Sequence, residues 1–407
     1  MDKRLLVVNL HFAPHRFGGG TVVAEACSRD LHRNHGWQVL VLTTIRDFNM
    51  PEYSLRRYRF DGMDVVAVVV HSEPDYLGDY SNPRFDAVVR DVLAAYRPTV
   101  CHAHALQGLG VGWFPALREY GCRLAVTLHD CWWLCDRQFM INSDGRYCNQ
   151  QRIDRAQCQY CTASIGALRE RDRQLRDALQ YVDRLLYPSE FHRRLHVASG
   201  FPEATSQVNG NGICLPGEGF DALRRRSRAG GGKTVFGFTG GPGEIKGAAL
   251  MLSAFEQAGL ANYSLRVVDA AQNLGTSWRS SSDWRRDVKV DFVSAYTMET
   301  MDTFFAGIDV LLFPSQWKES FGLTVREALA RDVWVIATDC GAPVENIVDG
   351  ENGRLVPFDS GPRELAAALV EAAGRDWADY RNPYKGQLRS FASQSAELDE
   401  ILRGLLE

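Results

Sequence analysis

The segment VLLFPSQWKESFGLTVREALA, residues 310–330, contains a strand, a turn and a helix in one short stretch. The uninterrupted apolar run at 310–315 is typical of a strand that is buried on both faces. Apolar residues then recur at the spacing of a helix: Val325, Ala328 and Leu329. A buried strand followed directly by a helix is the basic unit of a parallel α/β sheet, so this segment predicts that fold class.

Two acidic residues, Glu319 and Glu327, lie eight positions apart in this segment. Glu319 falls in the loop after the strand, and Glu327 lies about one turn into the helix. An acidic residue near a helix N-terminus complements the helix dipole, which explains Glu327 alone. The pair flanks the Phe321-Gly322 turn, and this arrangement indicates a ligand-binding loop rather than a helix cap alone.

Length and composition limit the classes of protein that the chain can represent. The 407 residues are 45% hydrophobic and 24% charged, which suggests two soluble globular domains. The formal net charge of −4 argues against a nucleic-acid partner. We expect no signal peptide and no membrane span, because no apolar run is long enough and the N-terminus enters a strand at once. The expected compartment is therefore the cytoplasm, where the ten cysteines would stay reduced.

The alternation of strands and helices extends over the whole chain. In the first half the predicted strands are 4–10, 37–44, 64–70, 99–105 and 123–130, with helices that include 21–34 and 84–96. The pattern restarts near 184–191. The later predicted strands are 234–241, 265–270, 288–293, 310–315 and 334–339. We therefore predict an α/β protein with two Rossmann-like, doubly wound units.

Glycine-rich loops distinguish these units from dinucleotide-binding domains. Neither unit carries G-x-G-x-x-G after its first strand, which disfavours a dehydrogenase. The first unit has RFGGG at 16–20 instead, leading into a helix. Its candidate anion-binding residues are Arg16, Gly18, Gly19 and Gly20, because glycines at a helix N-terminus allow close backbone approach. A loop tip without a ligand is the alternative.

Several motifs follow one another in a defined order. They are TLHD (127–130), YPSEF (187–191), NGI (211–213), KG (246–247), ESFGLTVREALA (319–330) and VIATDCGAPVENIVDGENGRLVP (335–357). With these motifs the chain resembles the family 4 retaining glycosyltransferases of the GT-B fold, over nearly its whole length. The resemblance implies two Rossmann-like domains facing a central crevice, in which a nucleotide-diphosphate sugar is the donor. It also implies a glycan or lipid-linked acceptor and a role in cell-surface polysaccharide biosynthesis.

The same resemblance assigns roles to individual residues. Glu319 would contact the transferred sugar, Glu327 the ribose hydroxyls and Lys246 the leaving diphosphate, while His129 would contact the sugar from the other domain. The further donor-binding residues would be Phe321, Gly322, Leu323, Gly240 and Gly241. A positive charge at Lys246 would allow transfer without a catalytic metal. A surface lysine is the alternative for Lys246, and without the resemblance a structural pair is the favoured interpretation of His129-Asp130.

The family pattern also suggests domain boundaries and shows one departure. The first domain would span 1–187, with a Cys-rich insertion at 131–161, and the second would span 188–385. A C-terminal helix in 386–407 would pack back on the first domain. The family often has an arginine five residues before the lysine, where this chain has Gly241. Arg16 is a candidate substitute.

A cluster of cysteines occupies the insertion. Without Cys131, the spacing is C-x12-C-x9-C-x2-C, through Cys135, Cys148, Cys158 and Cys161. The residues between the first two predict a β-hairpin with a turn at Asp144-Gly145, which would bring Cys135 and Cys148 together. Four thiolates suit a structural zinc ion. An iron–sulfur cluster and independent buried thiols remain alternatives.

Two other functions fit part of the pattern: a sugar-nucleotide epimerase of similar architecture, and a non-catalytic nucleotide-sugar-binding protein.

The acceptor is the least defined partner. The segment ALRERDRQLRDAL (167–179) carries four arginines at polar helical positions: Arg169, Arg171, Arg173 and Arg176. They suggest weak association with anionic lipid at the inner face of the membrane. A solvated helix with internal salt bridges is the alternative.

Overall fold

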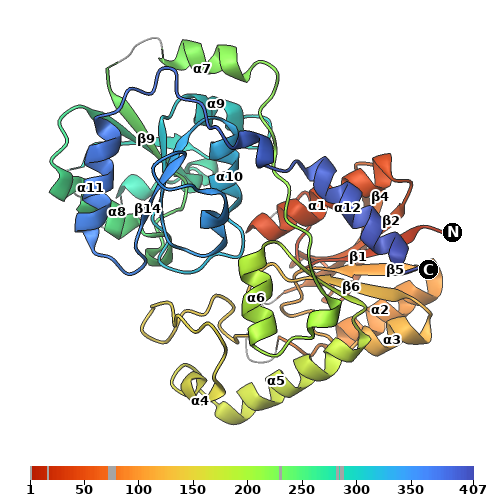
Figure 1. Cartoon of the computed structure of the whole chain (residues 1–407). Coiled ribbons are helices and arrows are strands. Elements are labelled where there is room, and N and C mark those ends of the chain that lie inside the picture. Colours follow the sequence, from red (N-terminus) through yellow and green to blue (C-terminus); the bar gives the residue numbers. More distant parts are fainter. Residues whose placement is uncertain (1, 16–17, 72–78, 229–231, 281–283, 285–287) are drawn as a thin grey trace. The chain divides into compact units, whose positions relative to one another are not determined.

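The computed structural model describes residues 2–15, 18–71, 79–228, 232–280, 284 and 288–407. It divides into two compact units (Figure 1). The first contains residues 1–143, 148–212 and 389–407, and the second contains 144–147 and 213–388. Each unit has its own sheet and helices, which confirms the predicted α/β class with two Rossmann-like units.

The first unit is built on an eight-stranded sheet in the order β3-β4-β2-β1-β5-β6-β7-β8. The strands are β1 (Arg4–Val8), β2 (Gln38–Arg46), β3 (Leu55–Phe60), β4 (Met63–Val70), β5 (Val100–Ala103), β6 (Arg123–Thr127), β7 (Arg184–Tyr187) and β8 (Ser206–Val208). All neighbours pair in parallel except β3 and β4. The chain winds outward from β1 in both directions, so the switch point of the topology lies between β1 and β5.

Helices connect these strands. They are α1 (Gly18–Asn34), α2 (Pro83–Tyr96), α3 (Phe114–Glu119), α4 (Arg155–Cys158), α5 (Ile165–Ala178), α6 (Glu190–Ala198) and α12 (Phe391–Gly404). Polar side chains begin several of them, because the first N–H groups of a helix lack intrahelical partners. Asn82, Ser164 and Ser189 accept hydrogen bonds from the N–H groups three residues ahead, at the starts of α2, α5 and α6.

Strand β3 was not predicted. Its sequence, LRRYRF, is strongly charged, because an edge strand exposes many of its side chains. It pairs antiparallel with β4 through a tight turn in which both Asp61 and Gly62 have positive φ, 52° and 89°. An Asp-Gly pair is a preferred sequence for this type of hairpin turn.

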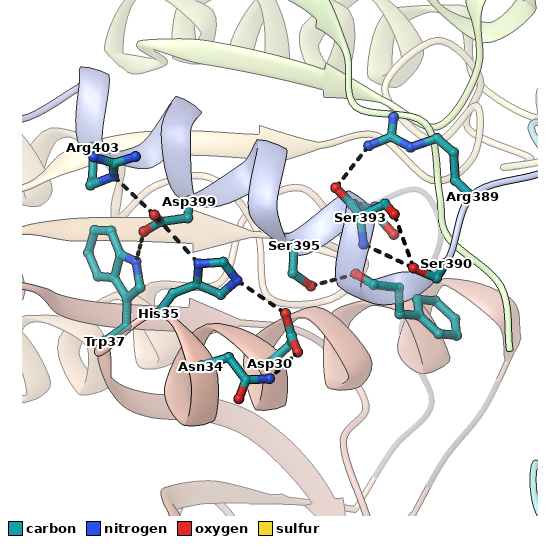
Figure 2. Close-up of polar contacts among 12 residues, drawn as sticks. Asp30, Asn34, His35, Trp37, Arg389, Ser390, Ser393, Ser395, Asp399 and Arg403 are labelled. Atoms are coloured by element: carbon teal, nitrogen blue, oxygen red, sulfur yellow. Dashed lines mark hydrogen bonds and ion pairs between the residues drawn. The ribbon is translucent and has the colours of Figure 1, made fainter. Parts of the chain in front are cut away.

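The last helix, α12, belongs to the first unit. Its residue Asp399 accepts hydrogen bonds from Trp37 Nε1 at 2.7 Å and from Lys3 Nζ at 3.2 Å. Figure 2 shows Asp399 between Trp37 and His35, two residues that follow α1.

The first unit also includes residues up to Gly212, because β7 and β8 extend its sheet. The boundary expected at residue 187 is therefore too early.

The second unit is built on a six-stranded, all-parallel sheet in the order β11-β10-β9-β12-β13-β14. The strands are β9 (Thr234–Phe238), β10 (Tyr263–Asp269), β11 (Val290–Ser294), β12 (Val310–Phe313), β13 (Trp334–Thr338) and β14 (Gly353–Val356). Its helices are α7 (Phe220–Arg228), α8 (Ala248–Ala258), α9 (Met301–Ala306), α10 (Leu323–Ala330) and α11 (Pro362–Ala373). The central strands are almost entirely buried, as their apolar sequences predict. The switch point lies between β9 and β12.

Candidate functional site

The switch point of the second unit brings together two loops that the sequence singled out. The loop after β9 leads to Lys246 and α8, and the loop after β12 leads to Glu319 and α10. Because β9 and β12 are parallel neighbours, these loops leave the sheet at the same edge. This is the position at which open α/β sheets bind ligands.

Gly247 allows the two loops to approach closely. It has φ 78° and is the residue that precedes α8. A Cβ atom at this position would lie 1.9 Å from the carbonyl oxygen of Pro314, in the loop after β12. Any other residue would therefore force apart the N-terminus of α8 and this loop.

Lys246 and Glu319 form an ion pair at this edge of the sheet. Their Nζ and Oε1 atoms are 2.7 Å apart, and the hydroxyl of Ser315 also donates to Oε1 at 3.3 Å. The backbone of Glu319 is fixed by hydrogen bonds to Cys340 and Ala342. The structure thus brings together the two residues that were predicted to contact the diphosphate and the sugar.

The Phe321-Gly322 turn begins α10. Gly322 has φ 78°, and a Cβ there would lie 2.6 Å from the ring of Pro343. Phe321 is buried, and the guanidinium of Arg326 lies 3.8 Å from the centre of its ring. The side chain of Phe321 is therefore a structural anchor, whereas the backbone N–H groups at the start of α10, including that of Leu323, are the groups suited to an anion.

Glu327 lies on the second turn of α10 and is only 8% exposed. Burial raises the pKa of its carboxyl to about 7, and the nearby positive charge of Arg331 opposes only part of this shift. Arg331 is itself bound elsewhere, to Asp302 at 2.6 Å and to the carbonyl of Cys214 at 2.9 Å. Among the described residues, none donates a hydrogen bond to the Glu327 carboxylate. A buried acceptor of this kind suits the hydroxyls of a ligand.

The loop after β9 shows how Gly240 and Gly241 are placed. A Cβ on Gly240 would lie 2.8 Å from the ring of Phe238 and 3.1 Å from the Cβ of Lys246, so this glycine keeps the lysine close to the strand. Gly241 has φ 79°, and the ring of Trp278 is the nearest group to a Cβ built there, at 3.5 Å. Arg16, the candidate substitute for the missing arginine, lies outside the described residues.

In the first unit, the predicted glycine segment lies against the predicted histidine. Gly18, Gly19 and Gly20 form the first turn of α1. A Cβ on Gly20 would lie 3.0 Å from Cγ of His129, so a larger residue would require the ring or the start of α1 to shift by a few tenths of an ångström. Burial lowers the pKa of His129 to about 4, so its imidazole is neutral near pH 7.

His129 and Asp130 do not act as a pair. Asp130 accepts hydrogen bonds from the side-chain amides of Gln107 and Gln138 and from the backbone N–H of Trp132. Its role is to fix the loop that follows β6. His129 contacts His104, a residue that was not predicted: His104 Nδ1 and His129 Nε2 are 2.9 Å apart. The H-x-H pattern at the end of β5 could have identified it.

The four cysteines of the predicted zinc site line a single cavity together with Met140 and Gln150. The backbone N–H of Cys148 donates to the carbonyl of Met140 at 2.8 Å, so the chain turns back as predicted, although no strand of either sheet forms there. Within the described ranges, no group of three or more His, Cys, Asp and Glu side chains is close enough to hold a metal ion. The structural zinc therefore remains a prediction.

A buried network of hydrogen bonds and an ion pair fixes the loop after His129. Arg171, on α5, donates to the carbonyl of Trp132 at 2.7 Å, and its Nε lies 3.6 Å from Oδ1 of Asp79. The indole N–H of Trp132 donates to the other oxygen of Asp79. Burial raises the pKa of Asp79 to about 7.

Two of the other three arginines of α5 form ion pairs with acids of the same helix. Arg173 pairs with Glu170 and Asp177, and Arg176 pairs with Asp172. These contacts match the alternative of a solvated helix with internal salt bridges. Throughout the part of the chain that is described, no helix is both long enough and apolar enough to cross a bilayer.

Comparison with known families agrees with this geometry. The model described as "Glycosyltransferase Family 4" matches residues 17–215, and that described as "Glycosyl transferases group 1" matches residues 219–382. The two models cover the two units in turn. This chain belongs to the family 4 glycosyltransferases of the GT-B fold.

Individual relatives are distant from this glycosyltransferase chain. The Salmonella typhimurium lipopolysaccharide 1,2-N-acetylglucosaminetransferase is 23% identical over 184 residues, which are 42% of this chain and 48% of that protein. This chain spans about half the length of the curated relatives it matches. Sucrose-phosphate synthase from Thermosynechococcus elongatus has a TM-score of 0.69 at 17% identity, with 99% of both chains covered. HepE from Anabaena, solved with UDP and glucose, has a TM-score of 0.66 at 15% identity, with 99% of this chain and 100% of that chain covered.

Proposed function

We propose that this chain is a retaining glycosyltransferase that moves a sugar from a nucleoside-diphosphate donor to a hydroxyl of a glycan or a lipid-linked acceptor. The observation that carries this proposal is the Lys246–Glu319 pair, which lies beside the N-termini of α8 and α10 at the switch point of the second unit. Two helix N-termini and a lysine favour a group with several negative charges, and a diphosphate is such a group.

The reaction breaks the bond between the anomeric carbon and the diphosphate oxygen and forms a bond from that carbon to the acceptor oxygen. Negative charge develops on the departing diphosphate, and the acceptor hydroxyl gives up its proton to an oxygen of that leaving group. The ammonium of Lys246 and the N–H groups that begin α10 stabilise the charge as it develops. We therefore propose that the leaving group needs no divalent metal.

The two acids then have different tasks. Glu327, a buried carboxylate, accepts hydrogen bonds from the ribose hydroxyls of the donor, and Glu319 accepts from hydroxyls of the transferred sugar. When the donor binds, Lys246 exchanges part of its contact with Glu319 for the diphosphate. This exchange keeps both side chains extended toward the ligand before binding, which lowers the entropy lost on binding. His129, in the first unit, is a neutral side chain that can donate a hydrogen bond to a sugar hydroxyl.

Relatives support the class of donor and a role in cell-surface polysaccharide synthesis. HepE was solved with UDP and glucose, and WaaG is a glycosyltransferase involved in lipopolysaccharide biosynthesis. We propose cytoplasmic synthesis of a surface polysaccharide by this chain, at the inner face of the membrane when the acceptor is lipid-linked. Because most arginines of α5 are paired, we expect only weak, salt-sensitive binding to anionic vesicles.

Transfer assays with UDP- and ADP-sugars and lipid-linked or oligosaccharide acceptors test the proposal, with the anomeric configuration of the product determined by NMR. We expect Lys246→Met to lower the transfer rate about 100- to 1000-fold. The matched control is Lys385→Met, which removes another partly exposed lysine paired with an acid, Asp332, in the same unit. Equal rates for the two variants, an inverted product, or a sugar epimer formed without acceptor would contradict the proposal.

A further inference from the structure

His104 occupies the switch point of the first unit. It follows β5, between the neighbouring strands β1 and β6, and is only 4% exposed. Its backbone N–H donates to the carbonyl of Val8 at the end of β1. The backbone of His104 is therefore fixed at the edge of the sheet.

The rings of three histidines lie close together at this edge. The rings of His104 and His129 are nearly parallel, with centres 5.2 Å apart and planes 15° apart. The ring centre of His102 lies 4.0 Å from that of His104, and its Nε2 bonds the hydroxyl of Thr127 at 2.7 Å. A ring nitrogen of His104 also contacts a ring nitrogen of His129, Nδ1 to Nε2 at 2.9 Å.

All three rings are neutral near pH 7. Burial lowers the pKa of His102 to about 3 and that of His129 to about 4, and it lowers the pKa of His104 well below its ordinary value. A neutral imidazole carries one N–H and one bare nitrogen. The 2.9 Å contact therefore has one donor and one acceptor, and only two tautomer combinations are allowed.

The surroundings of His104 distinguish these combinations. Its Nε2 is buried and has no hydrogen-bond partner among the described residues. An orphaned N–H is rarer in proteins than an under-used acceptor. The proton of His104 therefore belongs on Nδ1, where it has a partner, and Nε2 of His129 is the acceptor. It follows that His129 carries its own proton on Nδ1.

We propose that His104 is a positioning residue that donates from Nδ1 to Nε2 of His129 and holds that ring as its Nδ1-protonated tautomer. Gly20 packs against the carbon edge of the same ring, so the ring is fixed in plane as well as in protonation. With Nε2 occupied, His129 is a hydrogen-bond donor and not a proton acceptor. The identity of the group that receives this bond, a sugar hydroxyl, rests on the proposed function. The assignment of the His129 tautomer does not rest on the proposed function.

Long-range ¹⁵N–¹H NMR on full-length protein labelled at histidine tests the tautomer directly. His129 is assigned by the signal that is lost in His129→Gln. We expect a neutral ring with its proton on Nδ1 in the wild-type protein at pH 7. A ring protonated on Nε2, or doubly protonated, would overturn the proposal. This measurement needs no substrate, so it stands whether or not the transferase assignment is right.

Variants then test the effect on turnover. His104→Leu should shift His129 toward the Nε2 tautomer and lower kcat/KM about tenfold, the equivalent of one hydrogen bond. His104→Asn places an amide nitrogen near the former Nδ1 and should restore both the tautomer and the rate. The control is His196→Asn, which removes another buried histidine whose Nδ1 bonds only the carbonyl of His192. An unchanged His129 tautomer in His104→Leu, or a loss of the Nδ1 form in His196→Asn, would refute the role of His104.

Discussion

The buried carboxylate of Glu327 makes donor binding depend on pH. Burial raises its pKa to about 7, and in the proposed complex the ionised form accepts the ribose hydroxyls. A ligand that needs the ionised form binds with an apparent affinity reduced by the fraction of protein in that form. We therefore expect the donor to bind more tightly as the pH rises through 7.

The size of the change in donor affinity with pH follows from the pKa of Glu327. With a pKa of about 7, about nine-tenths of Glu327 is ionised at pH 8 and about one-tenth at pH 6. The apparent dissociation constant for the donor should therefore be about tenfold higher at pH 6 than at pH 8. A nucleotide sugar, in which the terminal phosphate is esterified, has no phosphate group that titrates between these values. It is the correct ligand for this experiment, whereas a free nucleoside diphosphate is not.

Isothermal titration calorimetry at pH 6, 7 and 8 measures the effect. Glu327→Gln should bind the donor more weakly at pH 8 and should show no pH dependence. Glu364→Gln, on the first turn of α11, is the control for loss of one acidic residue in the same unit. A pH profile for Glu327→Gln that matches the wild-type profile would refute the assignment of the titrating group.

The raised pKa of Glu327 also makes the stability of the ligand-free protein depend on pH. A carboxyl whose folded pKa is raised stabilises the fold below its unfolded pKa, and this contribution is lost as the pH rises through about 7. The shift from 4.5 to about 7 corresponds to about 3 kcal/mol at most. Glu327→Gln should therefore raise Tm by several degrees at pH 8 and by much less at pH 5. An equal gain at both pH values would contradict this reasoning.

Three further predictions follow from single residues. Gly20→Ala should displace the ring of His129 and lower kcat, while the affinity for the donor stays within about twofold of wild type; a large loss of donor affinity would contradict this. Metal analysis should find about one zinc per chain, lost in Cys158→Ser together with thermal stability; protein without zinc or iron would end that hypothesis. Asp399→Ala should lower the free energy of unfolding by about 2–4 kcal/mol, because it leaves the buried N–H of Trp37 unpaired. Burial raises the pKa of Asp399, but its hydrogen bonds lower it by more, so its stabilisation should be present at neutral pH and lost on acidification below the ordinary carboxylate range. A loss of stability in Asp399→Ala that is the same at acidic and neutral pH would count against this role.

The parts of the fold that the sequence predicted are those set by local pattern. Buried parallel strands are continuous apolar runs, and β1, β2, β9, β12 and β13 were all expected within a few residues. Strand β3 was missed because its register is set by pairing with β4, and three of its six residues are arginines. The Asp61-Gly62 turn carried the signal that was overlooked.

The extent of the first unit depended on contacts that are distant in sequence. Strand β8 is only three residues long, and no periodicity distinguishes so short an element. Likewise, the arginines of α5 look alike in the sequence. Only the structure shows that Arg171 is buried against Trp132 and Asp79, whereas Arg173 forms exposed ion pairs.

The candidate site was predicted where its residues are close in sequence. Glu319, the Gly322 turn and Glu327 all belong to one strand-turn-helix segment, so their proximity is fixed by local geometry. The distance from Glu319 to Lys246 was expected only through the family resemblance, and the structure supplies it. His104 was not predicted because its contact with His129 joins two different strand ends, and the H-x-H pattern at 102–104 was the signal that the sequence offered.

Both units build their candidate site in the same way, and this explains which residues must be small. In each, a glycine near the start of a helix packs against a group from a neighbouring strand end: Gly247 against Pro314, and Gly20 against His129. The contact removes the space that a side chain would fill, so the N-terminus of the helix approaches the edge of the sheet. A titratable side chain is then held beside that N-terminus, Lys246 in one unit and His129 in the other. The charge of Lys246 suits a leaving diphosphate, and the neutral ring of His129 suits a hydroxyl. Lys246 is partly exposed and paired with Glu319, whereas burial keeps the ring of His129 neutral.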